Sequence, residues 1–108
     1  MAWSVEVLNE VVREELRTLP KDMRAKIGHT LHLMETYGPQ ALHEPRVKQL
    51  RGKLWEIRVI GEDGIARAVY FTAVGQRIVV VLAFQKKTQK TPARLIDLAE
   101  TRAKELPT

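Results

Sequence analysis

Lysines that could bind phosphate gather in one short segment of this chain, FQKKTQKTP at residues 84–92. The segment contains Lys86, Lys87 and Lys90 and no acidic residue. Lysine is a compact point charge that binds phosphate, and crowding by other cations can lower its pKa enough for it to carry a proton. Either solvent takes up these charges or a polyanion does, and the second alternative predicts a phosphate-binding site.

Two arginines lie within strand-like stretches where charge is unexpected. Arg67 shares its parity with Ile65 and Val69 in the stretch IARAVYFT, and Arg58 lies opposite the Trp55 face of LWEIRVI. The planar guanidinium matches phosphate oxygens and stays charged. We therefore expect Arg67 to stabilise a phosphate, the alternative being rim arginines that reach water.

Further basic residues cluster in RVKQLRGKLWEIR, residues 46–58, where Glu56 is the one acid. The whole chain carries 18 Lys and Arg against 13 Asp and Glu, a net charge of +5 and a pI near 9.8. Like charges gathered on one sheet face repel one another unless a ligand compensates them. This balance favours a polyanionic partner, which could be nucleic acid, an acidic protein or a membrane surface.

Several function classes have no support in the sequence. No cysteine is present, so disulfides and thiolate zinc sites are excluded. His29 and His32 lack a carboxylate motif such as HExxH, and no phosphate-binding glycine loop exists, so we expect neither metal nor cofactor. The acidic N-terminus and the short apolar run at residues 78–84 predict a soluble cytoplasmic protein with no membrane partner.

The chemistry-bearing residues need a sheet to position them. Residues 3–8 read as an edge strand, and two amphipathic helices follow, the first capped by Asn9 and the second begun after Pro20. We expect these helices to form an antiparallel hairpin. Three antiparallel strands then follow in LWEIRVI, IARAVYFT and RIVVVLAF.

The last element is a helix for which Thr91 is expected as the N-cap and Pro92 as the first helical residue. The layout is β-α-α-β-β-β-α in one domain over residues 1–108. This is an α+β fold in which a small, twisted, mainly antiparallel sheet packs against the helical hairpin and the C-terminal helix.

The motifs LWEIRV, RAVYF and VVVLAFQKKTQKTP, followed by a helix with Ala99 and Arg102, resemble a known family. Their order and spacing are similar to those of the RelE/ParE superfamily of bacterial toxins, specifically the HigB-type, phage-derived branch. The resemblance covers the chain from about Lys48 to the end and implies a RelE-like fold.

This resemblance implies the toxin of a type II toxin-antitoxin pair. Such a toxin enters the ribosome and cleaves messenger RNA without a metal, by activating the ribose 2′-hydroxyl, and so inhibits translation. Its expected partners are the ribosome, mRNA and a cognate antitoxin of helix-turn-helix type, with operator DNA bound only through the antitoxin complex.

Matching positions make Arg67, Lys86 and Lys87 the expected catalytic residues of this endoribonuclease. The residues expected to bind RNA are the other cations of the sheet half and of the lysine segment: Lys48, Arg51, Lys53, Arg58, Arg77 and Lys90. One position departs from the pattern, because several relatives carry a proton-transfer side chain where this chain has Ala83.

Two alternative functions are consistent with much of the same sequence evidence. The ParE branch of the superfamily inhibits DNA gyrase and is not a nuclease. A non-catalytic nucleic-acid-binding domain is the other alternative, but its expected row of stacking aromatics is poorly met by Trp55, Tyr70 and Phe71, and we expect Trp55 to be buried.

Overall fold

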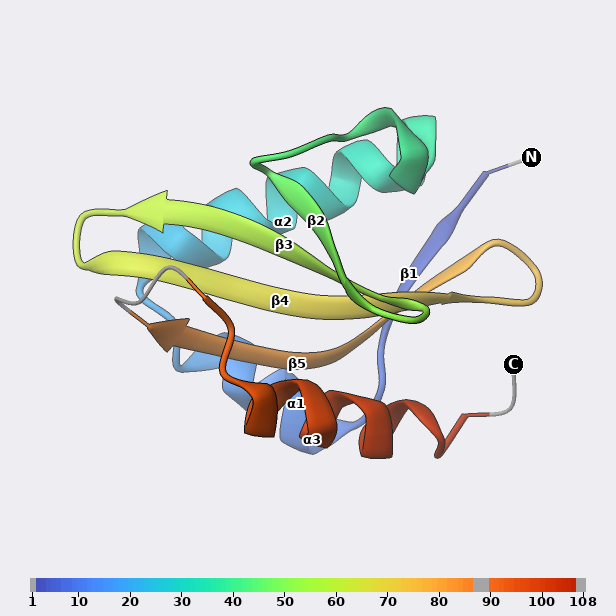
Figure 1. Ribbon diagram of the computed structural model, residues 1–108. Coiled ribbons are helices and arrows are strands. Elements are labelled where there is room, and N and C mark those ends of the chain that lie inside the picture. Colours follow the sequence, from blue (N-terminus) through green and yellow to red (C-terminus); the bar gives the residue numbers. More distant parts are fainter. Residues whose placement is uncertain (1, 87–89, 107–108) are drawn as a thin grey trace.

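A five-stranded sheet with helices on both faces forms the molecule, as the computed structural model shows (Figure 1). The structure describes residues 2–86 and 90–106. The helices and strands follow one another in the order β1 Ser4–Val7, α1 Glu10–Arg17, α2 Lys21–Tyr37, a short 3₁₀ helix Pro39–Ala41, β2 Val47–Arg51, β3 Leu54–Gly61, β4 Gly64–Ala73, β5 Arg77–Lys86 and α3 Ala93–Ala103.

The strands lie in the order β1-β5-β4-β3-β2. Neighbouring strands from β2 to β5 are antiparallel, and β1 is an edge strand that pairs with β5 in parallel. The predicted α+β architecture and the mainly antiparallel sheet are confirmed. Strand β2 is an addition, because its residues were expected only to lead into the next strand.

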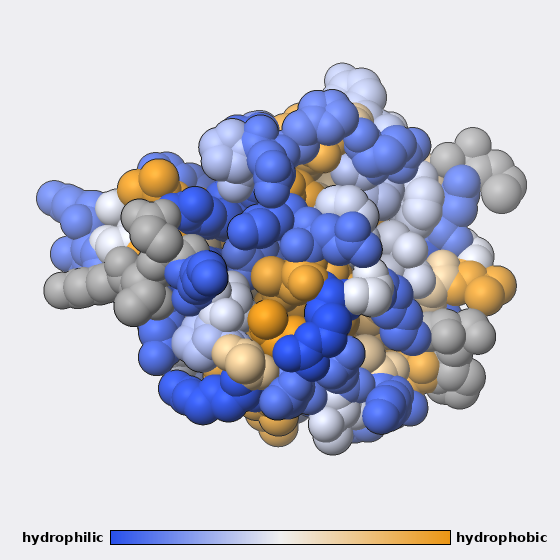
Figure 2. Space-filling view, viewed as in Figure 1, coloured by the Kyte–Doolittle hydropathy of each residue, from blue (hydrophilic) through white to orange (hydrophobic). Residues whose placement is uncertain are grey.

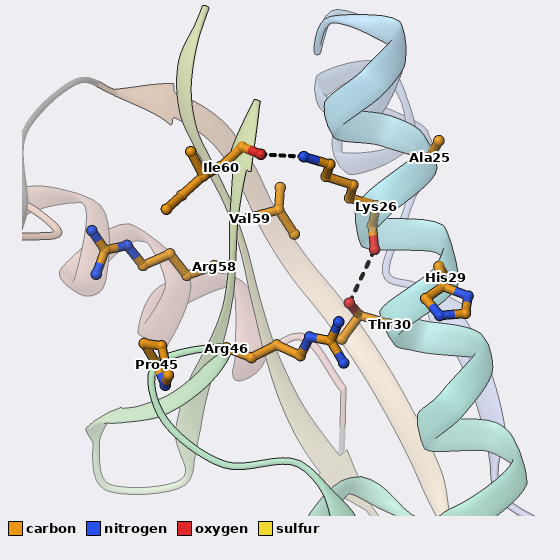
Figure 3. A pocket seen from close by; sticks show the side chains of 9 residues that line it. All are labelled: Ala25, Lys26, His29, Thr30, Pro45, Arg46, Arg58, Val59 and Ile60. Atoms are coloured by element: carbon orange, nitrogen blue, oxygen red, sulfur yellow. Dashed lines mark hydrogen bonds between the residues drawn. The ribbon is translucent and has the colours of Figure 1, made fainter. Parts of the chain in front are cut away.

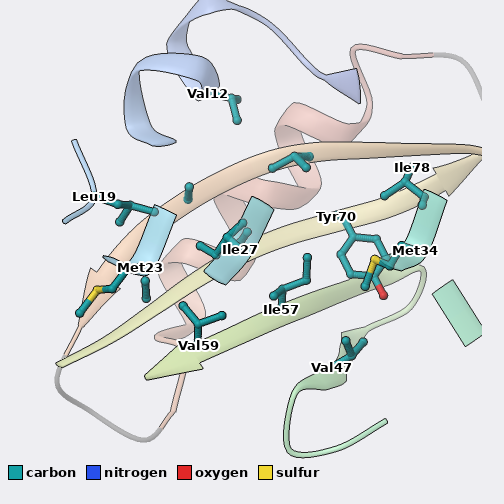
Figure 4. Packing of buried hydrophobic residues seen from close by; sticks show 14 residues of the cluster. Val12, Leu19, Met23, Ile27, Met34, Val47, Ile57, Val59, Tyr70 and Ile78 are labelled. Carbon is teal, nitrogen blue, oxygen red and sulfur yellow. The ribbon is translucent and has the colours of Figure 1, made fainter. Parts of the chain in front are cut away.

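Two buried clusters divide the core between the faces of the sheet. Helices α1 and α2 share one cluster with the sheet, in which Val12, Met23 and Ile27 pack over Ile57 and Tyr70 (Figure 4). Helix α3 packs on the other face through its buried alanines and joins a second cluster. Figure 1 shows α3 in front of the sheet and α2 behind it, so the face that carries α3 is separate from the helical-hairpin face.

The helix boundaries follow local chemistry. Asn9 caps α1, and its side chain accepts a hydrogen bond from the backbone N–H of Val12, as predicted. Gly38 ends α2 with φ of 89°, a conformation that costs glycine little. The prediction for α3 is wrong by one residue, because Pro92 is the N-cap residue and the Thr91 hydroxyl bonds elsewhere.

Strand β5 is apolar on both faces because both are buried under helices, and its register also shifts within the strand. Val69 of β4 pairs with Leu82, but the next residue, Tyr70, pairs with Val80, which leaves Val81 as the extra residue of a bulge. Side chains before and after the bulge therefore alternate in different phase. The bulge places Ala83 on the face that carries α1 and α2.

The outer edge of β5 beyond β1 is closed by an ion pair. Glu15 of α1 accepts a hydrogen bond from the backbone N–H of Ala83, and Arg102 of α3 donates to the carbonyl of Val81. The two side chains also bind each other, with Nη2 to Oε2 at 2.8 Å. This pair satisfies backbone groups that would otherwise remain open on an edge strand, and it links α1 to α3.

We expect Arg102→Ala to lower the free energy of unfolding by about 1.5–3 kcal/mol, the range for hydrogen bonds that involve charged groups. Arg17→Ala is the matched control, because Arg17 pairs with Glu10 and Glu14 on the exposed surface of α1. Its loss should stay within about 0.5 kcal/mol. Urea unfolding followed by circular dichroism measures the free energy of unfolding of both variants. Equal losses would contradict the stabilising role of the Glu15–Arg102 ion pair.

Candidate functional site

The face of the sheet that carries α3 holds several of the basic residues singled out in the sequence. In the pairing register, Arg58 of β3, Arg67 of β4 and Phe84 of β5 lie in one row across the strands. The next row toward the open end of the sheet contains Lys86, opposite Ile65. Directly paired residues point to the same face, and neighbouring strands lie about 4.8 Å apart. The register therefore brings Arg58, Arg67 and Lys86 together.

Arg67 is fully buried at the centre of this row, with no exposed side-chain surface. Its Nε lies 3.5 Å from Oε1 of Glu56, which is itself nearly buried. Glu56 accepts a further hydrogen bond from the hydroxyl of Thr91. Three elements therefore meet at one carboxylate: β3, β4 and the segment that leads into α3.

Burial lowers the pKa of the Arg67 guanidinium from its ordinary value, because removal from water disfavours the charged form. The negative charge of Glu56 acts in the opposite direction, and the neighbouring charge of Arg58 lowers the pKa further. Arginine still remains charged at neutral pH. The site thus contains a buried cation that the carboxylate of Glu56 stabilises and the cation beside it repels.

Arg58 and Lys86 are partly exposed and flank the buried Arg67. An anion that binds at this face can therefore reach these two side chains, whereas the guanidinium of Arg67 has no contact with solvent. The exposed Lys48 lies beside Glu56 in the register of β2 and β3. These positions make one basic surface across β5, β3 and β2.

Two more predicted residues lie near this surface. The ammonium of Lys53 sits 4.8 Å from the centre of the Phe71 ring, a cation–π contact at the turn between β2 and β3. Lys90 is exposed and directly precedes Thr91. Lys87 lies outside the described residues.

Two predicted RNA-binding residues instead pair with carboxylates. Arg51 contacts Asp97 and Glu100 of α3, each at 2.7 Å, and so ties that helix to β2. Arg77 binds Glu6 of β1 through two nitrogens at the far end of the sheet. Their charges are neutralised within the protein, and Arg77 is not brought together with Arg67 and Lys86.

Ala83 does not belong to this site. The bulge in β5 turns it to the opposite face, where it is buried among residues packed under α1 and α2. A proton-transfer side chain at this position would point away from Arg58 and Lys86. The absence of such a side chain at residue 83 therefore removes nothing from the basic surface.

The aromatic residues do not form one stacking surface. Tyr70 lies on the α2 face, whereas Phe71 is buried on the α3 face. Trp55 was expected to be buried, but 38% of it is exposed. Figure 2 shows mainly hydrophilic residues on the side that carries α3, with apolar residues in the hollow between the strands and the helix.

Among residues 2–86 and 90–106, no three His, Cys, Asp or Glu side chains are close enough together to hold a metal ion. The described helices include none that is long and apolar enough to cross a membrane. His29 and His32 are both exposed on α2, and His32 lies 3.9 Å from Glu35.

Sequence reasoning missed the roles of Glu56 and Thr91. Two signals were present: Glu56 is the one acid in a basic segment, and its strand parity places it on the face of Arg58. Arg67 in an apolar strand also requires a counter-ion. The partner of Thr91 could not be found in this way, because the hydrogen bond joins residues 35 positions apart.

The family model for phage-derived protein Gp49-like matches residues 14–104, which include every element from α2 to α3. The chain belongs to the Gp49-like family. No curated protein sequence matches it. Among solved structures, it is similar to a free-state arginine double mutant of the E. coli toxin RelE, with a TM-score of 0.65 and 17% identity. The alignment covers 99% of this chain and 100% of the RelE chain, so the Gp49-like chain has the RelE fold.

We expect Arg67→Ala to lower the free energy of unfolding by about 3–5 kcal/mol, because the change leaves Glu56 buried without its cation. Arg67→Met/Glu56→Gln should recover at least half of that loss, since it removes both charges and keeps an acceptor for Thr91. Urea unfolding of Arg67→Met, Glu56→Gln and the double variant measures the coupling. Purely additive losses would show that the two side chains do not depend on each other.

Proposed function

We propose that this protein is the toxin of a toxin-antitoxin pair and acts as a metal-independent endoribonuclease on ribosome-bound messenger RNA. The RelE fold, the Gp49-like family and the basic surface on the α3 face support this proposal. The K-K-T-x-K-T-P segment further favours the HigB-type branch. The protein would act as one domain in the cytoplasm.

One observation carries the proposal, namely how the two ends of the lysine segment are held. Lys86 lies within the β5 ladder opposite Ile65, and Thr91 is bound to the Arg67–Glu56 pair. The segment therefore starts on β5, where Phe84 is opposite Arg67, and finishes at Glu56, two residues before the partly exposed Arg58 of β3. This arrangement concentrates lysine and arginine charge at one place on an open sheet face, as a phosphodiester substrate requires.

The reaction we propose is an in-line transesterification within RNA. The 2′-oxygen forms a bond to phosphorus while the bond from phosphorus to the 5′-oxygen breaks, which leaves a 2′,3′-cyclic phosphate and a 5′-hydroxyl. A base removes the proton from the 2′-hydroxyl, an acid delivers one to the 5′-oxygen, and cations neutralise the charge on the phosphorane oxygens.

The chain offers a residue for each of these tasks. Arg58 is the partly exposed arginine that can bind the phosphate oxygens, and Lys86 and Lys87 are proposed as phosphate ligands and proton carriers. Lys48, Lys53 and Lys90 would hold the flanking RNA. Arg67, which was expected to bind the phosphate directly, is proposed instead to position Glu56 and Thr91 from beneath the surface, because it has no contact with solvent.

A cognate antitoxin follows from this proposal. An acidic surface on the antitoxin would complement the net charge of +5. We propose a helix-turn-helix antitoxin, with operator DNA contacted through the complex and not by this chain alone.

Induction of the wild-type chain in bacteria should create new transcript 5′ ends inside translated regions within minutes. Arg58→Ala/Lys86→Ala should reduce their frequency at least about 100-fold, the usual effect of removing transition-state charge stabilisation. Both positions are partly exposed, so the variant should fold, whereas Arg67→Ala would confuse loss of activity with unfolding. Arg13→Ala, on the exposed face of α1, is the matched control.

Equal numbers of 5′ ends from the wild type and the double variant would contradict the assigned site. Arrested growth with intact transcripts and altered plasmid supercoiling would instead indicate a gyrase inhibitor of the ParE type. Salt-dependent RNA binding with no new 5′ ends would identify a non-catalytic binding domain.

A further inference from the structure

A second basic cleft lies outside the site described above, along the edge of β3. It encloses about 540 Å³ between α2, the end of β3 and the loop before β2. Figure 3 shows Arg46 reaching across the cleft toward Thr30 of α2, while Arg58 extends from β3 in the other direction. The cleft is therefore next to the basic sheet face but opens on a different side of the strand.

The charged residues that line this cleft are all basic. Lys26, Arg46 and Arg58 line it together with His29, and none of its lining residues is acidic. Three other arginines of this protein, Arg51, Arg77 and Arg102, each bind a carboxylate. In the described part of the chain, no carboxylate lies within ion-pair distance of Arg46. Cations in a cleft with apolar walls attract anions more strongly than the same charges on an open surface.

The backbone holds the cleft in shape. The ammonium of Lys26 donates to the carbonyl of Ile60, so α2 is tied to β3. Within α2, the hydroxyl of Thr30 donates to the carbonyl of Lys26. The carbonyl of Arg46 accepts a hydrogen bond from the N–H of Arg58 at 2.8 Å. A ligand would therefore meet cations on walls that are already fixed relative to each other, which reduces the ordering cost of binding.

We propose that this cleft is a second phosphate-binding subsite for RNA, which adjoins the residues that act on the scissile bond and shares Arg58 with them. Arg58 connects the two, because it lines the cleft and also lies in the row with Arg67 and near Lys86. An RNA strand that lies across the sheet face from β5 to β3 reaches the cleft at the edge of the sheet. Arg46 and Lys26 then bind a phosphate beyond the point of attack. The inference rests on the proposed function.

The adjoining basic face favours RNA over an acidic protein as the occupant. Phosphates recur along a flexible strand, so one RNA can engage both the sheet face and the cleft, which adds their binding energies through a short connection. The exposed side chain of Ile60 offers apolar surface against which a base can pack. The phosphate could belong to messenger RNA or to ribosomal RNA.

Binding to a fluorescein-labelled 2′-O-methyl oligouridylate of 12 nucleotides tests the proposal, since this probe keeps the phosphates but lacks the attacking hydroxyl. Arg46→Glu should weaken binding roughly tenfold, and Arg46→Ala should make the log–log salt dependence shallower by about 0.7, the value for one phosphate of a single strand. Arg24→Glu is the matched control, because it reverses an exposed charge on α2 outside the cleft and should change affinity less than about twofold. Cosedimentation with 70S ribosomes, in the same variants, is the second measurement.

An Arg46-dependent loss with the oligonucleotide identifies a messenger RNA subsite. Loss with ribosomes alone identifies ribosomal RNA, and both results support the cleft. Equal behaviour of Arg46→Glu and Arg24→Glu in both assays overturns it, as does an Arg46→Glu variant that binds RNA and ribosomes normally but escapes its antitoxin. Transcript cleavage by the variants is scored separately, so an Arg46-dependent complex without any cleavage retains the subsite while the nuclease proposal fails.

Discussion

The buried ion pair between Arg67 and Glu56 is the interaction on which the arrangement of the α3 face depends. A charge without contact to water is tolerated only with a close partner, so β3 and β4 cannot shift past each other without exposing or separating the pair. Thr91 adds the segment before α3 to the same carboxylate. The register of two strands and one end of the lysine segment are therefore set together.

Basic residues in this protein serve two separate purposes. Arg51, Arg77 and Arg102 bind carboxylates of other elements and hold α3, β1 and the outer edge of β5 in place. Arg46, Arg58 and Lys86 are at least partly exposed, around the free edge of β3 and the end of β5. The net charge of +5 alone does not distinguish these groups, because both add to it equally. Only the second group forms a surface suited to a polyanion.

The two faces of the sheet also differ in their chemistry. The face under α1 and α2 contains Tyr70, the exposed Trp55 and, because of the bulge in β5, Ala83. The face under α3 contains the charged residues and one buried aromatic, Phe71. Recognition there would depend on phosphate charge more than on base stacking, which agrees with a substrate chosen by its backbone and by the 2′-hydroxyl.

The sequence by itself determined the helices, four of the five strands, the Asn9 cap and the faces on which Arg58 and Arg67 lie, because these depend on local periodicity and local hydrogen bonding. Tertiary structure alone decided the rest. Strand β2 is short and basic and exists through its pairing with β3. The bulge that turns Ala83 away is set by pairing with β4. The partners of Arg67, Thr91 and Arg51, and the cleft between Lys26 and Arg46, join residues distant in sequence, so no local pattern specifies them.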